Sequence, residues 1–425
     1  MNRRLSPVFP IALVIILNAL AIPLNAQSGR EDYDDADPWL GFESTRPAAD
    51  SAAIARFLNS LAGTDPVVCQ LAVSSIGNHW GPGDSDNRIG LLSDEASEHA
   101  SRDALGQSVT DPAALSLLTA VLGEQRACVR RAAARMLGQS HSPEAVKQLR
   151  AALRQGNPRI RESAALGLAD AEDPGSFRDL AGALKDKEPA VVRMAAYALG
   201  DLEDARAVKP LGELLGSRDP GTRATAAWAL GEIEDIRAVD RLKGLVDDED
   251  PNVRLTAVEA LGEMEDYRST GALTGALKER DVRVRRAAAQ ALGEVEDAKA
   301  AGALEQALQD RDPVVRRLAA QALGELEGLK RAPARLVTAL SDGDPELAII
   351  AARSLGEIGD TLVVPALASA YRSEDPRMRY SVVSALGELE DSRGNAVLSL
   401  ARNDRDQIVR HKASEVLEDR EDDDD

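Results

Sequence analysis

A repeat of 31 residues constrains this chain more than any other feature. Leucines followed mostly by glycine recur at that interval, with a single interval of 32. A fixed period of this length is typical of solenoids, in which each repeat packs only against its neighbours. We therefore expect one elongated domain of ten repeats over residues 111–418 instead of several globular domains. The repeating leucines are Leu137, Leu168, Leu199, Leu230, Leu261, Leu292, Leu323, Leu355, Leu386 and Leu417.

Each repeat carries the start and end signals of a helix. Eleven residues before the leucine stands a polar residue, mostly aspartate, and proline follows it in seven repeats. A polar N-cap followed by proline at the first helical position favours a helix start. We expect the glycine after the leucine to end the helix, because glycine tolerates the left-handed conformation. In the repeat of Leu230 these signals predict a helix over 220–230.

An acidic turn follows the glycine, as in 232–235, 263–266 and 294–297. Its last aspartate is expected to cap a further helix, for example 236–246, where apolar residues recur at helical spacing. Solvated helix caps are the favoured interpretation of these turns, and attraction of a cationic partner or weak Ca²⁺ binding is the alternative. One helix hairpin cannot bury its apolar faces alone, whereas stacked hairpins can, so the pattern predicts a right-handed α-solenoid.

The pattern Asp-Pro-x-Val-Arg-x-x-Ala-x-x-Ala-Leu-Gly, as in Asp250 to Gly262, resembles the HEAT repeat. The short period resembles the bacterial PBS-lyase HEAT-like subgroup. The resemblance implies an all-α fold, a right-handed α-α superhelix of the HEAT/armadillo type, with about 11 helix pairs. The eleventh pair is expected at 50–77, before an insertion at 78–110. Proteins of this type are mostly binding scaffolds, although phycobilin lyases and deoxyhypusine hydroxylase share the repeat.

Neither enzyme activity is expected here. The resemblance implies that the hydroxylase holds two irons with repeated His-Glu pairs, but no histidine of this chain precedes glutamate. The phycobilin lyases act in the cytosol on pigment proteins, and no pigment-attachment residue carries over. We therefore predict a non-catalytic protein with no cofactor, no metal site and no catalytic residue. The four histidines are His79, His99, His141 and His411.

The N-terminus predicts export. Met1 to Arg4 is basic, Val8 to Leu24 is apolar apart from Asn18, and the stretch 24–26 resembles a cleavage site. We predict a signal peptide over 1–26 that is cleaved after Ala26, and a periplasmic or extracellular location. An uncleaved membrane anchor is the alternative, which the short, proline-interrupted stretch disfavours. An acidic flexible leader is expected over 27–49 and an acidic tail over 419–425.

The net charge limits the kinds of partner that can be expected, and the two cysteines can form a disulfide. The formal net charge of −20 argues against nonspecific nucleic-acid binding, which requires a basic surface. Cys69 and Cys128 lie in the second helices of the repeats that flank the insertion. In an exported protein they can form a disulfide, and two buried thiols are the alternative.

Arginine recurs four residues after the cap in eight of the ten repeats. In HEAT-like stacks such arginines typically pair with turn carboxylates of the same or the next repeat, and the guanidinium fork suits that geometry. We predict a structural ladder of arginines and cap aspartates. Its representative members are Arg223, Arg254, Arg285, Arg316, Asp219, Asp250, Asp281 and Asp312.

The positions five and nine residues after the cap vary between repeats and share a helix face. We expect this face to line the concave surface and to carry an aromatic and basic stripe. Aromatic residues and arginine anchor many interfaces, so a protein or peptide partner in the cell envelope is predicted there. The alternative is ordinary surface, with the two aromatic residues packed on neighbouring helices. The predicted partner-binding residues are Arg193, Tyr197, Trp228, Arg286, Arg317 and Arg353.

Two other functions stay open at this stage. The first is an accessory subunit or divergent enzyme, lyase-like or metal-dependent, with its site in the insertion. The second is an envelope spacer that binds nothing specifically. The oligomeric state is undetermined. The candidate residues of the insertion are His79, Trp80, Asp84, Asp86 and His99.

Overall fold

The computed structural model describes residues 51–63 and 109–423. The chain divides into two compact bodies, an N-terminal body up to Ala207 and a C-terminal body from Val208. Within the described ranges every regular element is helical, and the pairing of Asp297 with Glu327 is an isolated bridge. The predicted all-α solenoid is therefore confirmed.

The N-terminal body contains three complete helix pairs after a leading helix. The second helices of these pairs, α6, α8 and α10, pack in sequence, and each first helix packs on its own partner. The leading helix α2 packs on α5 and α6. The elements are α2 (Ser51–Gly63), α5 (Pro112–Val121), α6 (Ala127–Gln139), α7 (Pro143–Ala152), α8 (Pro158–Asp170), η2 (Pro174–Ser176), α9 (Phe177–Ala183), α10 (Pro189–Asp201) and η3 (Ala205–Ala207).

The C-terminal body continues the same arrangement through seven pairs, and its even-numbered helices again pack in sequence. Its first helices are α11 (Val208–Leu214), α13 (Val239–Leu242), α15 (Thr270–Ala276), α17 (Ala301–Ala307), α19 (Ala334–Ala339), α21 (Val364–Ala370) and α23 (Asn395–Ala401). Its second helices are α12 (Pro220–Glu232), α14 (Pro251–Glu263), α16 (Val282–Glu294), α18 (Pro313–Glu325), α20 (Pro345–Ile358), α22 (Pro376–Glu388) and α24 (Gln407–Asp423). Short 3-10 turns are η4 (Ile236–Ala238), η5 (Lys243–Leu245), η6 (Tyr267–Ser269), η7 (Ala298–Ala300), η8 (Thr361–Val363) and η9 (Ser392–Gly394).

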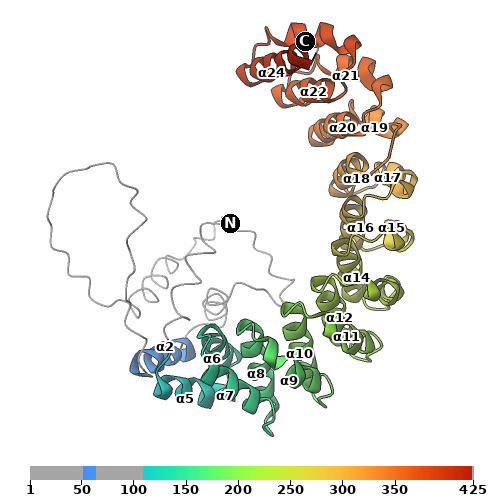
Figure 1. Cartoon of the computed structure of the whole chain (residues 1–425). Coiled ribbons are helices and arrows are strands. Elements are labelled where there is room, and N and C mark those ends of the chain that lie inside the picture. Colours follow the sequence, from blue (N-terminus) through green and yellow to red (C-terminus); the bar gives the residue numbers. More distant parts are fainter. Residues whose placement is uncertain (1–50, 64–108, 424–425) are drawn as a thin grey trace, which may run out of the picture. The chain divides into compact units, whose positions relative to one another are not determined.

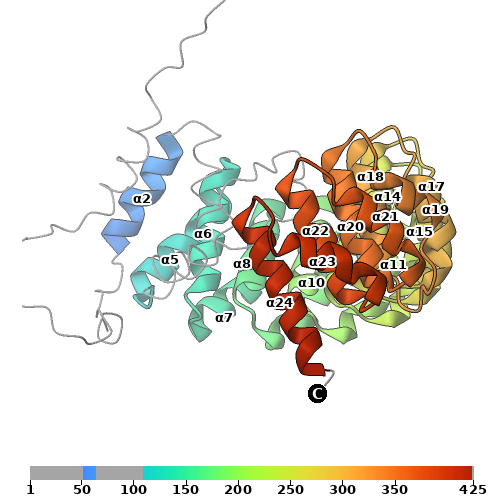
Figure 2. The ribbon, with the colours of Figure 1, turned by 90° about the horizontal axis from the view of Figure 1, so that it is seen from above.

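The two sets of helices in the C-terminal body form separate layers. Figure 1 shows α14, α16 and α18 along the inner side of this body's curve, with α15 and α17 on the outer side. Seen from above in Figure 2, α17 and α19 again lie outside α18 and α20. The second helices therefore present one long inner face.

Small residues make the close packing of the second helices feasible. The repeat leucines Leu230 and Leu261 are fully buried, and so are the alanines Ala226 and Ala257. Removal of these apolar side chains from water is the main favourable term in folding, and alanine lets neighbouring helices approach closely. Both residue types therefore form the core, as their spacing predicts.

The predicted role of the repeat glycine is wrong. The helix 220–230 in fact runs from Pro220 to Glu232, so Gly231 lies inside it. A Cβ placed on Gly262 would lie 2.7 Å from the Cβ of Ala291 and 3.0 Å from its Cα. The glycine is needed where consecutive second helices touch, not to end the helix.

The left-handed residue lies three positions after that glycine and is usually glutamate. Glu234 has a φ of 51° and Glu265 a φ of 47°, and their amides bond back to the glycine carbonyl. In the repeat of α20 a glycine, Gly359, holds this position with a φ of 73°. Its presence there shows which residue the turn geometry favours.

Other boundaries also differ from expectation. The predicted helix 236–246 is broken into η4, α13 and η5. The predicted tail continues α24 as far as Asp423, and Figure 2 shows this last helix running to the C-terminal end. The predicted signal peptide 1–26, the leader 27–49, the second half of the pair at 50–77 and nearly all of the insertion 78–110 lie outside the described residues. Over the ranges that are described, no helix is long and apolar enough to cross a bilayer.

Candidate functional site

In several repeats the arginine four residues after the cap joins its own repeat to the next. Arg223 donates from Nε to Asp248 at 2.8 Å and from Nη2 to the other oxygen of the same carboxylate at 2.6 Å. Its remaining nitrogen, Nη1, donates to the carbonyl of Ser217 at 2.9 Å. The guanidinium thus holds the turn of its own repeat and the carboxylate of the following one.

The other predicted ladder arginines have equivalent contacts. Arg285 bonds Asp310 at 2.9 and 3.0 Å, Arg254 lies 3.5 Å from Glu279, and Arg316 lies 3.7 Å from Asp344. Their partner is mostly the acidic residue two positions before the next cap, not the cap aspartate itself. This is because the guanidinium reaches the turn that precedes the next helix.

The cap aspartates Asp219, Asp250, Asp281 and Asp312 lie at the helix N-termini where the sequence places them. Their carboxylates accept backbone amides of the first turn, for example Thr222 N to Asp219 at 2.9 Å and Asn252 N to Asp250 at 2.9 Å. Asp281 accepts from Arg283 N at 2.9 Å, and Asp312 from Val314 N at 3.1 Å. These four residues therefore begin helices and are not open to a ligand.

Two predicted partner-binding arginines belong to the packing of the stack. Arg286 donates two hydrogen bonds to Asp312 at 2.9 and 2.6 Å, and Arg317 does the same to Asp344 at 3.0 and 2.7 Å. The hydrogen bonds from Arg286 lower the pKa of Asp312 to about 2. Each of these arginines ties a repeat to the cap of the next one, although the side chains stay 41% and 36% exposed, and their binding of a partner stays a prediction.

Tyr197 was predicted to lie on the partner-binding surface, but the structure buries it. Its side chain is only 3% exposed, so it is not a surface anchor. Trp228 and Arg193 are half-buried, whereas Arg353 is exposed. Tyr197 lies in the N-terminal body and Trp228 in the C-terminal body. The burial of Tyr197 removes one of the two aromatic residues from the predicted stripe.

An exposed column does remain on the second helices of the C-terminal body, which form the inner layer of its curve (Figure 1). Gln290, Gln321 and Arg353 occupy the position nine residues after the cap in α16, α18 and α20, and all three are exposed. Glutamates lie one turn further along the same helices, and Gln290 and Gln321 each donate to theirs at 2.9 Å. We call this set the inner column: Gln290, Glu294, Gln321, Glu325, Arg353 and Glu357.

The glutamates of this face were not singled out in the sequence. In six of the ten repeats a glutamate follows the leucine and glycine directly, and the sequence pattern assigns it to the acidic turn. The structure instead places them at the end of the second helix. A Cβ on Gly231 would collide with the carboxylate of Glu263, and one on Gly262 would collide with that of Glu294. Each carboxylate therefore packs over the glycine of the preceding repeat.

This packing shifts the acidity of Glu263. The residue as a whole is exposed, but its carboxylate is the part that packs on the Gly231 backbone. Burial, with the negative charges of Glu232, Glu259 and Glu294 next, raises the pKa of Glu263 to about 7. The inner face thus carries a row of carboxylates whose charges repel each other.

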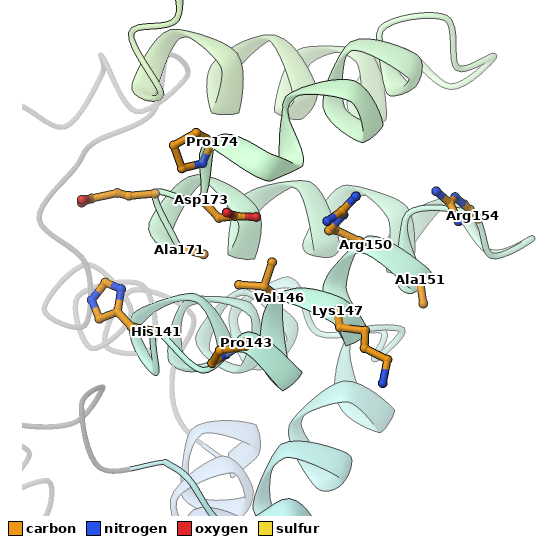
Figure 3. A pocket seen from close by; sticks show the side chains of 11 residues that line it. His141, Pro143, Val146, Lys147, Arg150, Ala151, Arg154, Ala171, Asp173 and Pro174 are labelled. Atoms are coloured by element: carbon orange, nitrogen blue, oxygen red, sulfur yellow. The ribbon is translucent and has the colours of Figure 1, made fainter.

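A groove of about 770 Å³ opens in the N-terminal body between α7 and the turn after α8. Figure 3 shows Lys147, Arg150 and Arg154 along one wall and Asp173 with Pro174 on the other. Arg150 and Arg154 both bond Asp179 at 2.6 Å, so these two cations are already engaged. Positively and negatively charged side chains line this open groove. The residues that line it do not include a convergent set of catalytic groups.

The described part of the chain contains no candidate metal site, and it does not include the candidate residues of the insertion. Over residues 51–63 and 109–423, no group of three or more His, Cys, Asp or Glu side chains is placed to hold a metal ion. The candidate residues of the insertion, His79, Trp80, Asp84, Asp86 and His99, lie outside these ranges. Cys128 on α6 is disulfide-bonded, whereas Cys69 is not among the described residues, so the pairing of these two cysteines stays a prediction.

The stacked helix pairs and their arginine ladder define a helical-repeat solenoid. Four stretches match the model for HEAT repeats, at 115–199, 180–250, 240–324 and 333–418, which together cover more than half of the sequence. The chain belongs to the HEAT repeat family. HEAT repeats generally mediate protein interactions, so this fold suggests an interaction scaffold.

Several solved structures resemble the chain at low identity. An engineered protein is 22% identical, with 72% of this chain and 98% of that chain covered and a TM-score of 0.47. YibA of Escherichia coli is 22% identical, with 58% and 92% covered and a TM-score of 0.45. The complex of CpcE and CpcF of phycocyanin lyase from Nostoc sp. PCC7120 is 23% identical, with 60% and 92% covered and a TM-score of 0.34. These values indicate nothing about function. A search of the curated proteins found no match.

Proposed function

We propose that this protein is an exported, non-catalytic scaffold that binds a protein or peptide partner in the cell envelope through the inner column. One observation carries the proposal. Most cap aspartates, repeat glycines and ladder arginines of the stack are engaged in packing. Gln290, Gln321 and Arg353, by contrast, are exposed at the same repeat position in three consecutive second helices. Aligned exposed side chains on consecutive repeats are what an extended partner would contact.

Export rests on the N-terminal sequence and is consistent with the cysteine chemistry. The disulfide at Cys128 supports an oxidising compartment, because disulfides persist outside the cytosol and are rare within it. Cell fractionation followed by N-terminal sequencing tests this part. We expect an envelope or secreted protein whose first residue is Gln27, and a full-length cytosolic chain would overturn it.

The binding surface is tested by crosslinking in the cell envelope. The mature protein is compared with a variant in which Gln290, Gln321 and Arg353 are changed to alanine. A matched control changes Gln306, Gln309 and Arg335, which have the same side chains and are also exposed, on or beside the outer helices α17 and α19. We expect a specific partner to be lost in the first variant and kept in the control.

Two results would contradict the proposal. Equal capture by the inner and outer variants would show that the inner column does not bind the partner. Absence of any specific partner would favour the spacer. Both variants should melt at the temperature of the wild type, because the changed side chains lie on the surface and contribute little to stability.

A further inference from the structure

Two large apolar side chains are exposed on adjacent turns of the C-terminal body. Ile236 begins η4 and is 55% exposed, and Tyr267 begins η6 and is 67% exposed. They hold the same position in consecutive repeats. Isolated apolar residues on a surface are ordinary, but neighbouring ones that include a tyrosine are typical of binding surfaces.

Contacts between the turns make them one continuous surface. Arg268 donates from Nη2 to the carbonyl of Ile236 at 2.8 Å. In the next turn, Lys299 places its Nζ 5.8 Å from the centre of the Tyr267 ring, and Thr270 donates to Asp297 at 2.8 Å. We call these three turns, residues 234–237, 265–268 and 296–299, the turn strip.

The charges of the turn strip do not cancel. Each of its cations lies beside an aspartate of its own turn: Arg237 beside Asp235, Arg268 beside Asp266, and Lys299 beside Asp297. One glutamate per turn is then left over, which gives the strip an excess of three negative charges. These are Glu234, Glu265 and Glu296, all exposed and all held in the left-handed conformation.

We propose that the turn strip is a second binding surface, which takes a basic amphipathic segment of a partner protein. An apolar side chain of that segment would pack between Ile236 and Tyr267, and its lysines or arginines would lie against the three glutamates. A negatively charged lipid surface or nucleic acid would be repelled by the same excess charge. This surface lies on the turns and shares no residue with the inner column of the proposed scaffold.

The test uses a fluorescent peptide of leucine and lysine as the probe, with a leucine and glutamate peptide as its counterpart. Binding to the mature chain is measured by fluorescence anisotropy at two salt concentrations. We expect the basic peptide to bind and the acidic one not to bind. The double change Ile236→Ser/Tyr267→Ser should weaken binding about tenfold or more, as for other interface anchors.

Matched controls come from the same fold. Leu362 is 62% exposed on η8, the equivalent turn of another repeat, so Leu362→Ser should change binding less than twofold. The triple change of Glu234, Glu265 and Glu296 to glutamine should weaken binding and reduce its salt dependence. Glu390→Gln, at the same turn position of a distant repeat, should do neither.

Several outcomes would overturn the proposal that the turn strip binds a basic amphipathic segment. These are equal losses in Leu362→Ser and Ile236→Ser/Tyr267→Ser, binding of the acidic peptide, or full binding by the double variant. Loss of the peptide only in the variant of Gln290, Gln321 and Arg353 would place it on the inner column instead. If the envelope crosslinking shows that the inner column does not bind a partner, the peptide-binding result for the turn strip is unaffected. The two proposals are therefore tested independently.

Discussion

Arg379 and Asp404 are 25 residues apart and form a buried bidentate pair between consecutive repeats. Nε and Nη2 of Arg379 each lie 2.8 Å from an oxygen of Asp404, and both side chains are 5% exposed. Nη1 donates to the carbonyls of Ser373 and Glu374 at 3.0 and 2.9 Å. The hydrogen bonds from Arg379 hold the pKa of Asp404 well below its usual range. One side chain therefore closes its own turn and fixes the next repeat.

Arg379→Ala should destabilise the C-terminal body strongly. The change leaves the Asp404 carboxylate buried without its cation, which typically costs about 3–5 kcal/mol. Urea unfolding followed by circular dichroism measures the loss. The control is Arg377→Ala two residues away, whose side chain is 60% exposed beside Asp375, where a pair contributes about 0–1 kcal/mol. Equal effects of the two changes would contradict the ladder.

The same pair gives a pH dependence with a definite sign. The pKa of Asp404 is lower in the folded chain than the ordinary value of about 3.9 in the unfolded chain. Its contribution is therefore fully present above about pH 4 and is lost as the pH falls through the folded value. The stability difference between the wild type and Arg379→Ala should shrink below about pH 4.

Gly262→Ala should destabilise the stack although alanine favours helices. Its Cβ would meet Ala291 at 2.7 Å, closer than two carbon atoms normally approach, so α14 and α16 would have to separate. Overpacking of this kind costs about 1–3 kcal/mol. Gly271→Ala on α15 is the matched control, because nothing lies within 4 Å of the added atom. That change should be neutral or stabilising by up to about 1 kcal/mol, since alanine favours helices.

Asp170→Asn should stabilise the N-terminal body at neutral and higher pH. Burial raises the pKa of Asp170 to about 7, although Arg135 lies 3.8 Å away and opposes the shift. A raised carboxyl pKa means that stability falls as the pH rises from about 4 to 7, because only the unfolded chain ionises freely. At pH 8 the gain should be on the order of 4 kcal/mol, because each pKa unit corresponds to about 1.4 kcal/mol and the net shift already includes the attraction of Arg135.

The gain from Asp170→Asn should shrink as the pH falls and vanish below about pH 3, where the wild-type carboxyl is protonated in both states. Thermal unfolding from about pH 3 to pH 8 measures this. Glu144→Gln is the control, because this side chain is 52% exposed on α7 and is not among the charges that shift the pKa of Asp170, so the change should affect stability little. A gain of equal size at every pH would show that Asp170 does not titrate as described.

Glu265→Gly should stabilise the C-terminal body by about 1 kcal/mol. Glu265 has a φ of 47°, and a side chain held in this left-handed region costs about 1–3 kcal/mol, part of which glycine returns as chain entropy. Gly359 already holds the equivalent turn position. Glu265→Ala keeps the strained Cβ, so it should give no such gain in urea unfolding. If Glu265→Ala also stabilised the protein, the gain would come from removing the negative charge of Glu265 and not from relieving backbone strain.

Local signals explain how much of this fold follows from the sequence. The cap aspartates such as Asp250 and the prolines that follow seven of the caps act within one helix start, and the structure places them there. The period of 31 repeats this signal along the chain. The ladder arginine four residues after the cap is predicted from the resemblance to HEAT-like stacks. Its partner was assigned too coarsely, because Arg223 reaches Asp248 across a turn whose path the sequence does not give.

The candidate site depended on tertiary structure. The sequence by itself determined a stack of helical hairpins with caps and a repeating arginine, since these follow from chemistry within a few residues. Only the packing of one repeat on the next decided that Tyr197 is buried, that Arg286 is bound to Asp312, and that the repeat glycine is a helix contact. A repeat position has a fixed place along its own helix. Its exposure depends on what the neighbouring helices place against it.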